Sequence, residues 1–412
     1  MIRPLPPRPV PARTTDTSPA PTPAQAKSAG TARTALPHAA APARRSTAVR
    51  NTARAWSELL RVSALPSVPG DALAGAAAAG LRPGRGTAWA IGSSLCLYEA
   101  GMALNDWADR HEDAVERPHR PLPSGRVRPG AALGAAGLLT ATGLALAARA
   151  GRPALTVATA LAATVWAYDL RLKHTAAGPA AMATARGLDL LLGATATASA
   201  NRGGTPGTAR PDGVTAKGTT AGGARRASGP RRASGPRGAV TAAATGGFRR
   251  PAGPRGAVPA LPAAAALAAH TYAVTTVSRH EVHGGSTTAP LAGLATTAAL
   301  TVLTAAPGPA PHRPGTRGEP PSAPHRVPGG ATAERVTLLL ATVYFRTAAR
   351  PLLHAALNPS PLLTRQAVGG GVRAMIPLQA ALMARSGAPA GGLALLGLAP
   401  LARRLARKVS PT

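Results

Sequence analysis

The stretch PGAALGAAGLLTATGLALA, residues 129–147, contains no charged side chain. A helix of this length rises about 28 Å at 1.5 Å per residue, which is close to the ~30 Å thickness of a bilayer's hydrocarbon core. Comparable uncharged stretches occur at 153–168, 286–306 and 386–402. Because a single alanine-rich stretch is also common in soluble helical bundles, the repetition of such stretches is what indicates a membrane protein.

The apolar segments predict about nine transmembrane helices, separated by turns rich in proline and glycine. The predicted spans are 59–82, 87–104, 129–150, 153–170, 179–200, 257–277, 286–306, 333–352 and 366–386. A further apolar piece, 388–402, is either a tenth helix or the second half of the ninth. The first 50 residues lack the apolar core of a signal peptide, so we expect the first span to be an uncleaved membrane helix.

The positive charge of the chain is concentrated outside these spans. The sequence has 47 Lys and Arg against 15 Asp and Glu, for a formal net charge of +32. Much of the arginine lies in three segments rich in Gly, Pro, Ser or Ala, which cannot bury a core and are predicted to be disordered. We expect no nucleic-acid partner, because Phe248 is the single aromatic residue of the longest insertion and RNA-binding tails of this composition interleave aromatic residues.

The predicted organisation alternates membrane helices with these segments, and the single cysteine, Cys96, excludes an intramolecular disulfide. The predicted parts are a disordered tail (1–55), helices one to five with an acidic motif (56–200), an insertion (201–256), helices six and seven (257–306), a disordered loop (307–332) and the C-terminal helices (333–412).

The sequence NDWADRHEDAVERPHRPLPSGR, residues 105–126, holds five of the 15 acidic residues between positions 106 and 116. Asn105, Asp109 and Asp113 are spaced four apart, so a helix places them on one face, with Asp106 about 100° round. Oxygen ligands without His or Cys suit Mg²⁺. Arg117 and Arg120 follow the acids, and guanidinium groups bind phosphate bidentately. The motif therefore predicts a diphosphate carried on metal ions; alternatively, its acids and arginines only pair with each other at a solvated helix end.

The pattern N-D-x-x-D-x-x-x-D followed by E-R-P-x-R-P-L-P-S-G resembles the first signature of the UbiA superfamily of intramembrane prenyltransferases. Residues 58–75 resemble the opening helix of the family, and residues 168–179 are similar to its Y-x-x-x-L-K loop. Residues 187–194 and 270–285 look most like the EboC branch.

The resemblance implies an all-α membrane fold of about nine transmembrane helices around a central cavity. It also implies Mg²⁺-dependent ionisation of a polyprenyl diphosphate and attack by a small-molecule acceptor. The partners implied are these two molecules and the membrane lipid around the protein. The implied metal ligands are Asn105, Asp106, Asp109, Asp113 and Glu281, with Asp106, Asp109 and Asp113 as the catalytic acids. The implied diphosphate-binding residues are Arg61, Arg117, Arg120, Lys173 and Arg279.

Five further residues are candidates for the acceptor or the cavity: Tyr98, Tyr168, Arg186, Asp189 and His270. Each also has an ordinary structural explanation. The two tyrosines can belong to an interfacial aromatic belt. Arg186 and Asp189 can form an i, i+3 ion pair that lowers the cost of insertion, and His270 can be a hydrogen-bonded packing residue.

The sequence departs from the family pattern in the loop after the sixth helix. A second acidic motif, D-x-x-x-D, is expected there, but the segment TTVSRHEVHGG keeps a single acid, Glu281. Glu281 allows two interpretations. Either it completes a metal site with fewer acidic ligands, or the second metal is lost. In the latter case the protein binds an isoprenoid or another metabolite without catalysis, as a membrane component of an export or biosynthesis cluster.

The polar loops are predicted to share one side of the membrane. They are 105–128, 171–178, 278–285 and 353–365. Their short basic stretches obey the positive-inside rule, which predicts an integral protein of the bacterial plasma membrane with these loops in the cytoplasm. The pattern specifies neither the acceptor, nor the prenyl chain length, nor the oligomeric state.

Overall fold

A computed structural model describes residues 51–61, 65, 67–203, 257–306, 330–398 and 400, and every regular element in this part of the chain is helical. Most of the low-complexity segments predicted at 1–55, 201–256 and 307–332 lie outside the described residues. The structure departs from the predicted boundaries at three places, because residues 201–203 continue α7, residues 330–332 begin α10, and residues 51–59 are helical. The last of these is explained by packing, because Ala55 and Leu59 are buried in a cluster with Leu104.

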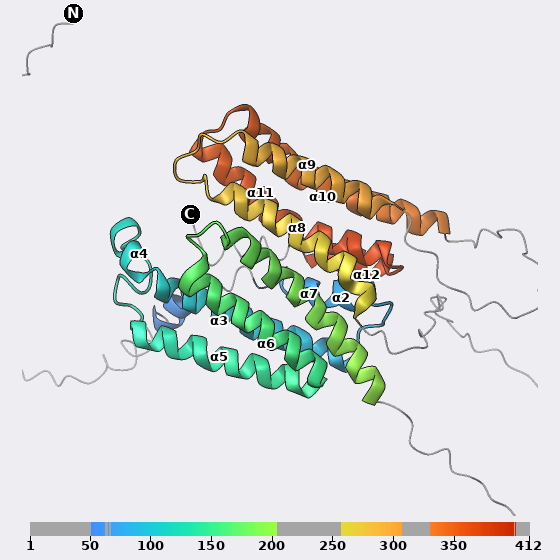
Figure 1. Ribbon diagram of the computed structural model, residues 1–412, viewed down its shortest axis with the longest axis horizontal. Helices are drawn as coiled ribbons and strands as arrows, with labels where there is room; N and C mark the ends of the chain where they lie inside the picture. Colours follow the sequence, from blue (N-terminus) through green and yellow to red (C-terminus); the bar gives the residue numbers. More distant parts are fainter. Residues whose placement is uncertain are drawn as a thin grey trace, which may run out of the picture. The chain divides into compact units, whose positions relative to one another are not determined.

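The helices run roughly side by side along the bundle (Figure 1). They are α2 (Pro69–Ala78), α3 (Arg85–Ala108), α4 (Arg110–Glu116), α5 (Pro129–Ala150), α6 (Arg152–Ala167), α7 (Gly178–Gly203), α8 (Leu261–Ser278), α9 (Thr288–Ala305), α10 (Gly330–Leu357), α11 (Pro361–Arg385) and α12 (Pro389–Leu396), with short turns η2 (Tyr168–Leu172) and η3 (Val258–Ala260).

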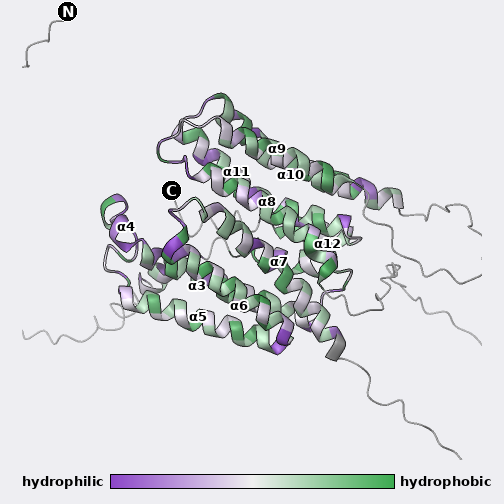
Figure 2. Cartoon of the chain, in the orientation of Figure 1, coloured by the Kyte–Doolittle hydropathy of each residue, from purple (hydrophilic) through white to green (hydrophobic). Residues whose placement is uncertain are grey.

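Five segments are long and apolar enough to cross a membrane: α5, Val258–Ser278, α9, α10 and α11. Figure 2 shows apolar residues along the long helices and hydrophilic residues around α4. The helices α3 and α7 reach spanning length, with 24 and 26 residues, and carry ionisable side chains in their interiors. The all-helical membrane fold is therefore confirmed, while the number nine stays a prediction.

The first predicted span, 59–82, is not one helix in the structure. The helix of residues 51–59 is followed by a turn at Leu60 and Arg61, where Arg61 has a left-handed φ of 49°, and α2 begins only at Pro69. Proline suits the first position of a helix, because its fixed φ is helical and its missing N–H would have no partner there. Seven of the ten residues of α2 are buried, so this short helix is an internal element instead of a lipid-facing span.

The interior of the bundle is held together around α2 and α7. Helix α7 packs against α2, α3, α6 and α8, and α2 also contacts α11. The close approach of α2 and α7 depends on glycine, because a Cβ on Gly193 would lie 2.3 Å from Cα of Ala72 and one on Gly75 would lie 2.0 Å from the Leu190 carbonyl oxygen. Two distant segments of the sequence are thereby brought into backbone contact at the centre of the protein.

We predict that Gly193→Ala destabilises the protein, because the added methyl group has to push α2 away from α7. Overpacking of this kind costs about 1–3 kcal/mol, which thermal unfolding in detergent would register as a lower midpoint. Gly134→Ala on α5 is the matched control, since a Cβ there meets no atom within 4 Å. The control should be unchanged or slightly more stable, and equal midpoints for both variants would contradict the packing argument.

Candidate active site

The acidic motif lies where α3 passes into α4. Asn105 and Asp106 occupy the last turn of α3, Asp109 is its C-cap, and Asp113 belongs to α4. The backbone N–H groups of Asp109 and Asp113 each donate to the carbonyl four residues earlier, at 2.9 and 2.8 Å. The helical four-residue spacing is therefore kept through the junction. The sequence predicts a single helix for these residues, whereas the chain forms two, α3 and α4.

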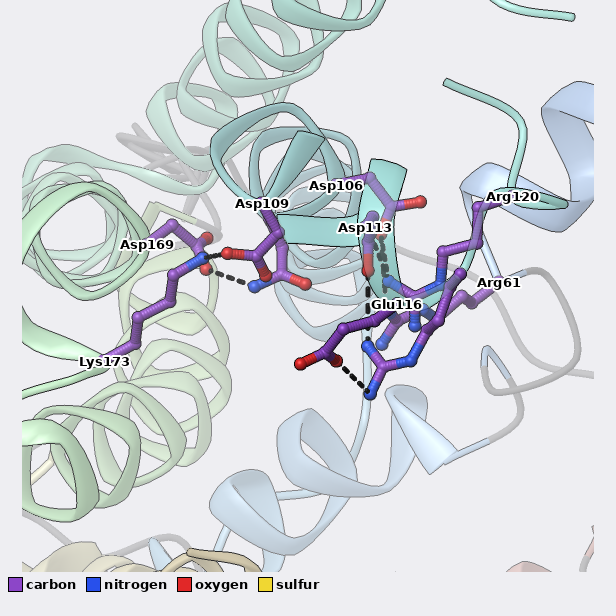
Figure 3. A network of polar contacts seen from close by, with 10 residues as sticks. Arg61, Asp106, Asp109, Asp113, Glu116, Arg120, Asp169 and Lys173 are labelled. Atoms are coloured by element: carbon purple, nitrogen blue, oxygen red, sulfur yellow. Dashed lines mark hydrogen bonds and ion pairs between the residues drawn. The ribbon is translucent and has the colours of Figure 1, made fainter. Parts of the chain in front are cut away.

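Asp113 is the most buried acid of the motif, with 2 % of its side chain exposed. Its carboxylate accepts from Arg120 Nη1 at 2.6 Å and from Arg117 Nη1 at 3.3 Å (Figure 3). The structure thus forms the acid–arginine pairing that the sequence left as an alternative. Asp113 itself is buried while its arginine partners reach the surface, so removing the arginines would leave a buried charge without compensation.

Asp106 also lies close to two arginines, Arg61 and Arg120. Its Oδ1 lies 3.3 Å from Arg61 Nη2 and 3.8 Å from Arg120 Nη1. Burial raises the pKa of the Asp106 carboxyl, and the two arginines oppose that shift. Arg61 is brought here by its left-handed backbone, a conformation that is uncommon for a residue with a side chain and that persists only where the surroundings stabilise it.

A second cation approaches the motif from the loop between α6 and α7. Lys173 forms an ion pair with Asp109, and Asn105 Nδ2 donates to Asp169 Oδ1 at 3.0 Å. Asp169 lies in the π-helical turn η2, and the N–H of Lys173 closes that turn on the Tyr168 carbonyl at 3.0 Å. The structure therefore places Lys173 against the first motif, as the family resemblance implies, with Tyr168 beside it.

Sequence reasoning missed several polar residues at this end of the bundle. Asp169 follows an apolar span directly and precedes Lys173 by four residues, a signal comparable to that of the first motif. Asp109, Glu112 and His174 have ligand atoms that all lie within 4.8 Å of one another, so they could hold a metal ion. The site therefore contains potential metal ligands outside the motif, namely Asp169 and His174.

The loop after α8 reaches the same end. Arg279 Nη1 donates to the Thr175 carbonyl at 2.8 Å, and the N–H of Gly285 donates to the Pro359 carbonyl at 2.8 Å. Burial raises the pKa of Glu281, with Arg365 and Arg117 lowering it in part. Arg117 also binds Asp113, and Arg365 is a further basic residue near this end of the bundle that the sequence did not single out.

A separate polar cluster lies deeper in the bundle and corrects the predicted pairing of Arg186 with Asp189. Arg186 Nη1 lies 2.5 Å from Asp71 Oδ2, across the interface of α7 with α2. Asp71 also accepts from Gln379 Nε2 at 2.7 Å, and Asp189 instead accepts from Ser94 Oγ at 2.5 Å. The buried side of α2 supplies a closer partner than the next turn of the same helix.

His270 has a packing role in the structure. Its Nε2 donates to the Gly371 carbonyl at 3.0 Å, so Nδ1 is the acceptor for the Tyr344 hydroxyl, also at 3.0 Å. The imidazole joins α8, α10 and α11 with both nitrogens engaged. This agrees with the packing explanation and leaves His270 no free polar atom for an acceptor. Tyr98, by contrast, is half-buried.

The fold and this site define a helical membrane protein with an acidic, cation-lined centre at one end. Residues 64–209 match the model of the UbiA prenyltransferase family.

Two relatives and one solved structure illustrate the similarity. The chain is 37% identical over 127 residues to digeranylgeranylglyceryl phosphate synthase of Methanopyrus kandleri, which is 30% of this chain and 45% of that protein. It is 65% identical over 26 residues to the bacteriochlorophyll synthase 33 kDa chain of Rhodobacter capsulatus, or 6% of this chain and 9% of that one. The chain thus spans less than half the length of the curated relatives that it matches. The apo structure of a UbiA homolog from Aeropyrum pernix K1 gives a TM-score of 0.48 at 15% identity, with 77% of this chain and 96% of that chain covered.

Proposed function

We propose that the protein transfers a prenyl group from a polyprenyl diphosphate to a small-molecule acceptor within the membrane. One observation carries the proposal: three acids of the motif form ion pairs with four cations, Arg61, Arg117, Arg120 and Lys173, at one end of a bundle of membrane helices. A dense, mutually neutralising set of acids and cations suits a ligand that brings both metal ions and phosphate groups. The match to the UbiA family supports the same activity.

The donor atoms present fit Mg²⁺. Asn105, Asp106, Asp109 and Asp113 offer only oxygen, as this ion prefers, and Asp169 adds a carboxylate hydrogen-bonded to Asn105. Asp106, Asp109 and Asp113 are each paired with an Arg or Lys, so we propose that these cations bind the phosphates while the carboxylates hold the metal. Mg²⁺ bound there would neutralise the diphosphate.

The remaining chemistry is assigned to side chains of the chain itself. Arg61, Arg120 and Lys173 donate hydrogen bonds to the diphosphate oxygens as the allylic C–O bond breaks and its electron pair leaves with the diphosphate. Charge that develops on the leaving group is stabilised most by donors held in place beforehand. The surrounding apolar helices keep water from the allylic carbon, so that the acceptor forms the new bond and releases its proton.

We further propose that the site lies on the cytoplasmic side of a bacterial plasma membrane. The support is the basic character of the loops at the motif end, which contain Arg126, Arg128 and Arg171 besides the site cations. Membership of the EboC branch is likewise a proposal, supported by the sequence of residues 187–194 and 270–285.

A second candidate function is non-catalytic binding of an isoprenoid or another metabolite. The observation that favours it is the α8–α9 loop, where Glu281 is the single acid in place of the second acidic motif and carries the electrostatic influence of Arg365 and Arg117. If the second motif is required to hold a metal ion, a loop with one acid among arginines binds the diphosphate without activating it.

The variant Glu281→Gln tests whether Glu281 is needed to hold a metal ion. We predict that it keeps at least a third of wild-type prenyl transfer, because the first motif and Asp169 already provide an oxygen-rich site. The measurement is the initial rate with purified protein and saturating Mg²⁺. A loss of a hundredfold or more would show that Glu281 is itself a metal ligand.

The proposed activity is tested with membranes that contain the full chain and a radiolabelled polyprenyl diphosphate. We expect label to enter an acceptor in the lipid extract in a Mg²⁺-dependent manner. Membranes containing Lys173→Met should show a large fall in prenyl transfer, since Lys173 pairs with Asp109 and is proposed to donate hydrogen bonds to the diphosphate. Equal labelling by the two membranes would argue against the site described here.

A further inference from the structure

The guanidinium group of Arg126 joins two segments that are far apart in the sequence. Its Nη1 donates to Glu58 Oε2 at 2.7 Å, on the helix of residues 51–59. Its Nη2 donates to the His119 carbonyl at 2.6 Å and its Nε donates to Ser124 Oγ at 3.0 Å, both in the loop between α4 and α5. All three nitrogens of one planar group are therefore engaged, and such a rigid fork fixes the relative positions of its partners.

The Glu58 end of this link leads to Arg61. The N–H of Arg61 donates to the backbone carbonyl of Glu58 at 3.2 Å, so both residues belong to one turn. In the described part of the chain, Arg61 is the only residue other than glycine with a positive φ, and its Nη2 lies 3.3 Å from Asp106 Oδ1. A left-handed backbone of this kind persists only where its surroundings stabilise it. Arg126 supplies such a contact three residues before Arg61.

The loop end of the link leads to Arg120. Ser124 Oγ, which accepts from Arg126, itself donates to the Arg120 carbonyl at 2.6 Å, and the Ser124 N–H donates to the same carbonyl at 3.0 Å. The other loop contact, His119, immediately precedes Arg120 in the chain. Arg120 Nη1 in turn lies 3.8 Å from Asp106 Oδ1. Short chains of hydrogen bonds therefore connect Arg126 to the backbone of both arginines that approach Asp106.

Apolar packing beside this link brings the same two segments together. Leu59 and Val127, the chain neighbours of Glu58 and Arg126, are buried in one cluster. Hydrophobic packing is not directional, so it does not by itself fix the orientation of residues at its edge. Glu58 and Arg126 are each 36 % exposed, and an ion pair at that exposure contributes little to stability. The link is therefore suited to orienting the two segments more than to stabilising the fold.

We propose that Arg126 and Glu58 are positioning residues that keep Arg61 and Arg120 in the arrangement that binds diphosphate. Both act through the backbone of an arginine that contacts the ligand. The inference rests on the proposed diphosphate binding at the acidic motif, and it applies to prenyl transfer and to non-catalytic binding alike. Without the link, the competent arrangement is populated only part of the time, and the apparent dissociation constant rises by the inverse of that fraction.

The first measurement is the Kd of inorganic pyrophosphate for the purified full chain in detergent with saturating Mg²⁺. Charge alone predicts opposite effects, because Arg126→Met removes a positive charge and Glu58→Met removes a negative one. The link predicts that both variants bind more weakly, by about five- to tenfold, a modest factor because the pair is exposed. The double variant should bind no more than about twofold more weakly than Arg126→Met, since one break already separates the segments.

The second measurement separates positioning from a general loss of structure. In prenyl transfer, both single variants should raise the KM for the polyprenyl diphosphate by the same factor as the Kd, with kcat within about threefold of the wild type. A variant that only lowers the folded fraction reduces kcat at an unchanged KM. Arg128→Met is the matched control, because it removes a nearby exposed arginine that forms no ion pair with any described residue; its Kd and KM should stay within about twofold of the wild type.

The proposal is overturned if Glu58→Met binds pyrophosphate as tightly as the wild type or more tightly, or if the losses of the single variants multiply in the double variant. A lowered kcat at unchanged KM, or no binding of pyrophosphate by the wild type, overturns it as well. The expected changes in Kd without any prenyl transfer would support the link and contradict the enzymatic function. Prenyl transfer that is lost in Asp109→Asn but kept at the wild-type KM in Glu58→Met would contradict the link alone.

Discussion

Replacing Asp109 with asparagine should lower prenyl transfer by about 10²- to 10³-fold, the effect typical of removing one preorganised group that stabilises a developing charge. Asp109 is the point where the first motif meets Lys173, and it also belongs to the group with Glu112 and His174 that can hold a metal. The amide keeps the shape of the side chain while removing its charge. The measurement is the initial rate of the purified variant over a range of Mg²⁺ concentrations.

Glu334→Gln serves as the control for this loss, since it removes an exposed carboxylate far along the chain from the motif and should leave the rate within twofold. The unfolding midpoint of Asp109→Asn should stay close to that of the wild type, because Asp109 is at a helix junction and half-buried. If Asp109→Asn retained a third of the wild-type rate, the acidic motif would not be the catalytic centre.

The second large effect is expected from Arg186→Met. This change leaves Asp71, which is fully buried, without its ion-pair partner. Breaking a buried pair by removing one partner costs about 3–5 kcal/mol, so the protein should unfold at a much lower temperature or fail to accumulate in the membrane.

A double variant keeps this prediction testable if the single variant does not fold. Arg186→Met combined with Asp71→Asn removes the uncompensated charge, and we expect it to recover at least half of the lost stability. Arg152→Met, an exposed arginine at the start of α6, is the control and should change the midpoint little. A double variant no more stable than Arg186→Met would show that the charge of Asp71 is not the cause.

Much of the motif end could be predicted from the sequence because its residues are local. The four-residue spacing of Asn105, Asp109 and Asp113 survives in the backbone hydrogen bonds, and the long uncharged runs are helices. Lys173 could be placed only through the resemblance to a family, since nothing in its own loop indicates that it pairs with Asp109.

The contacts that the sequence did not reveal are those between distant segments. Arg186 has an acid one turn away on its own helix, and local spacing therefore favoured Asp189 as its partner. The actual partner, Asp71, is 115 residues away in the sequence and is brought near by the glycine-mediated packing of α2 on α7. Glu281 and Arg365 are also distant in the sequence. Their loops, α8–α9 and α10–α11, meet where the N–H of Gly285 donates to the Pro359 carbonyl.

The central claim is that this bundle end ionises a prenyl diphosphate, and it is tested most directly by diphosphate release from the purified full chain. Polyprenyl diphosphates of several chain lengths are supplied together with a lipid extract as the acceptor source. We predict Mg²⁺-dependent release of diphosphate matched by an equal amount of prenylated product, with both abolished by chelation of the metal. Absence of diphosphate release at every chain length would contradict the enzymatic function and leave non-catalytic binding as the account of the site.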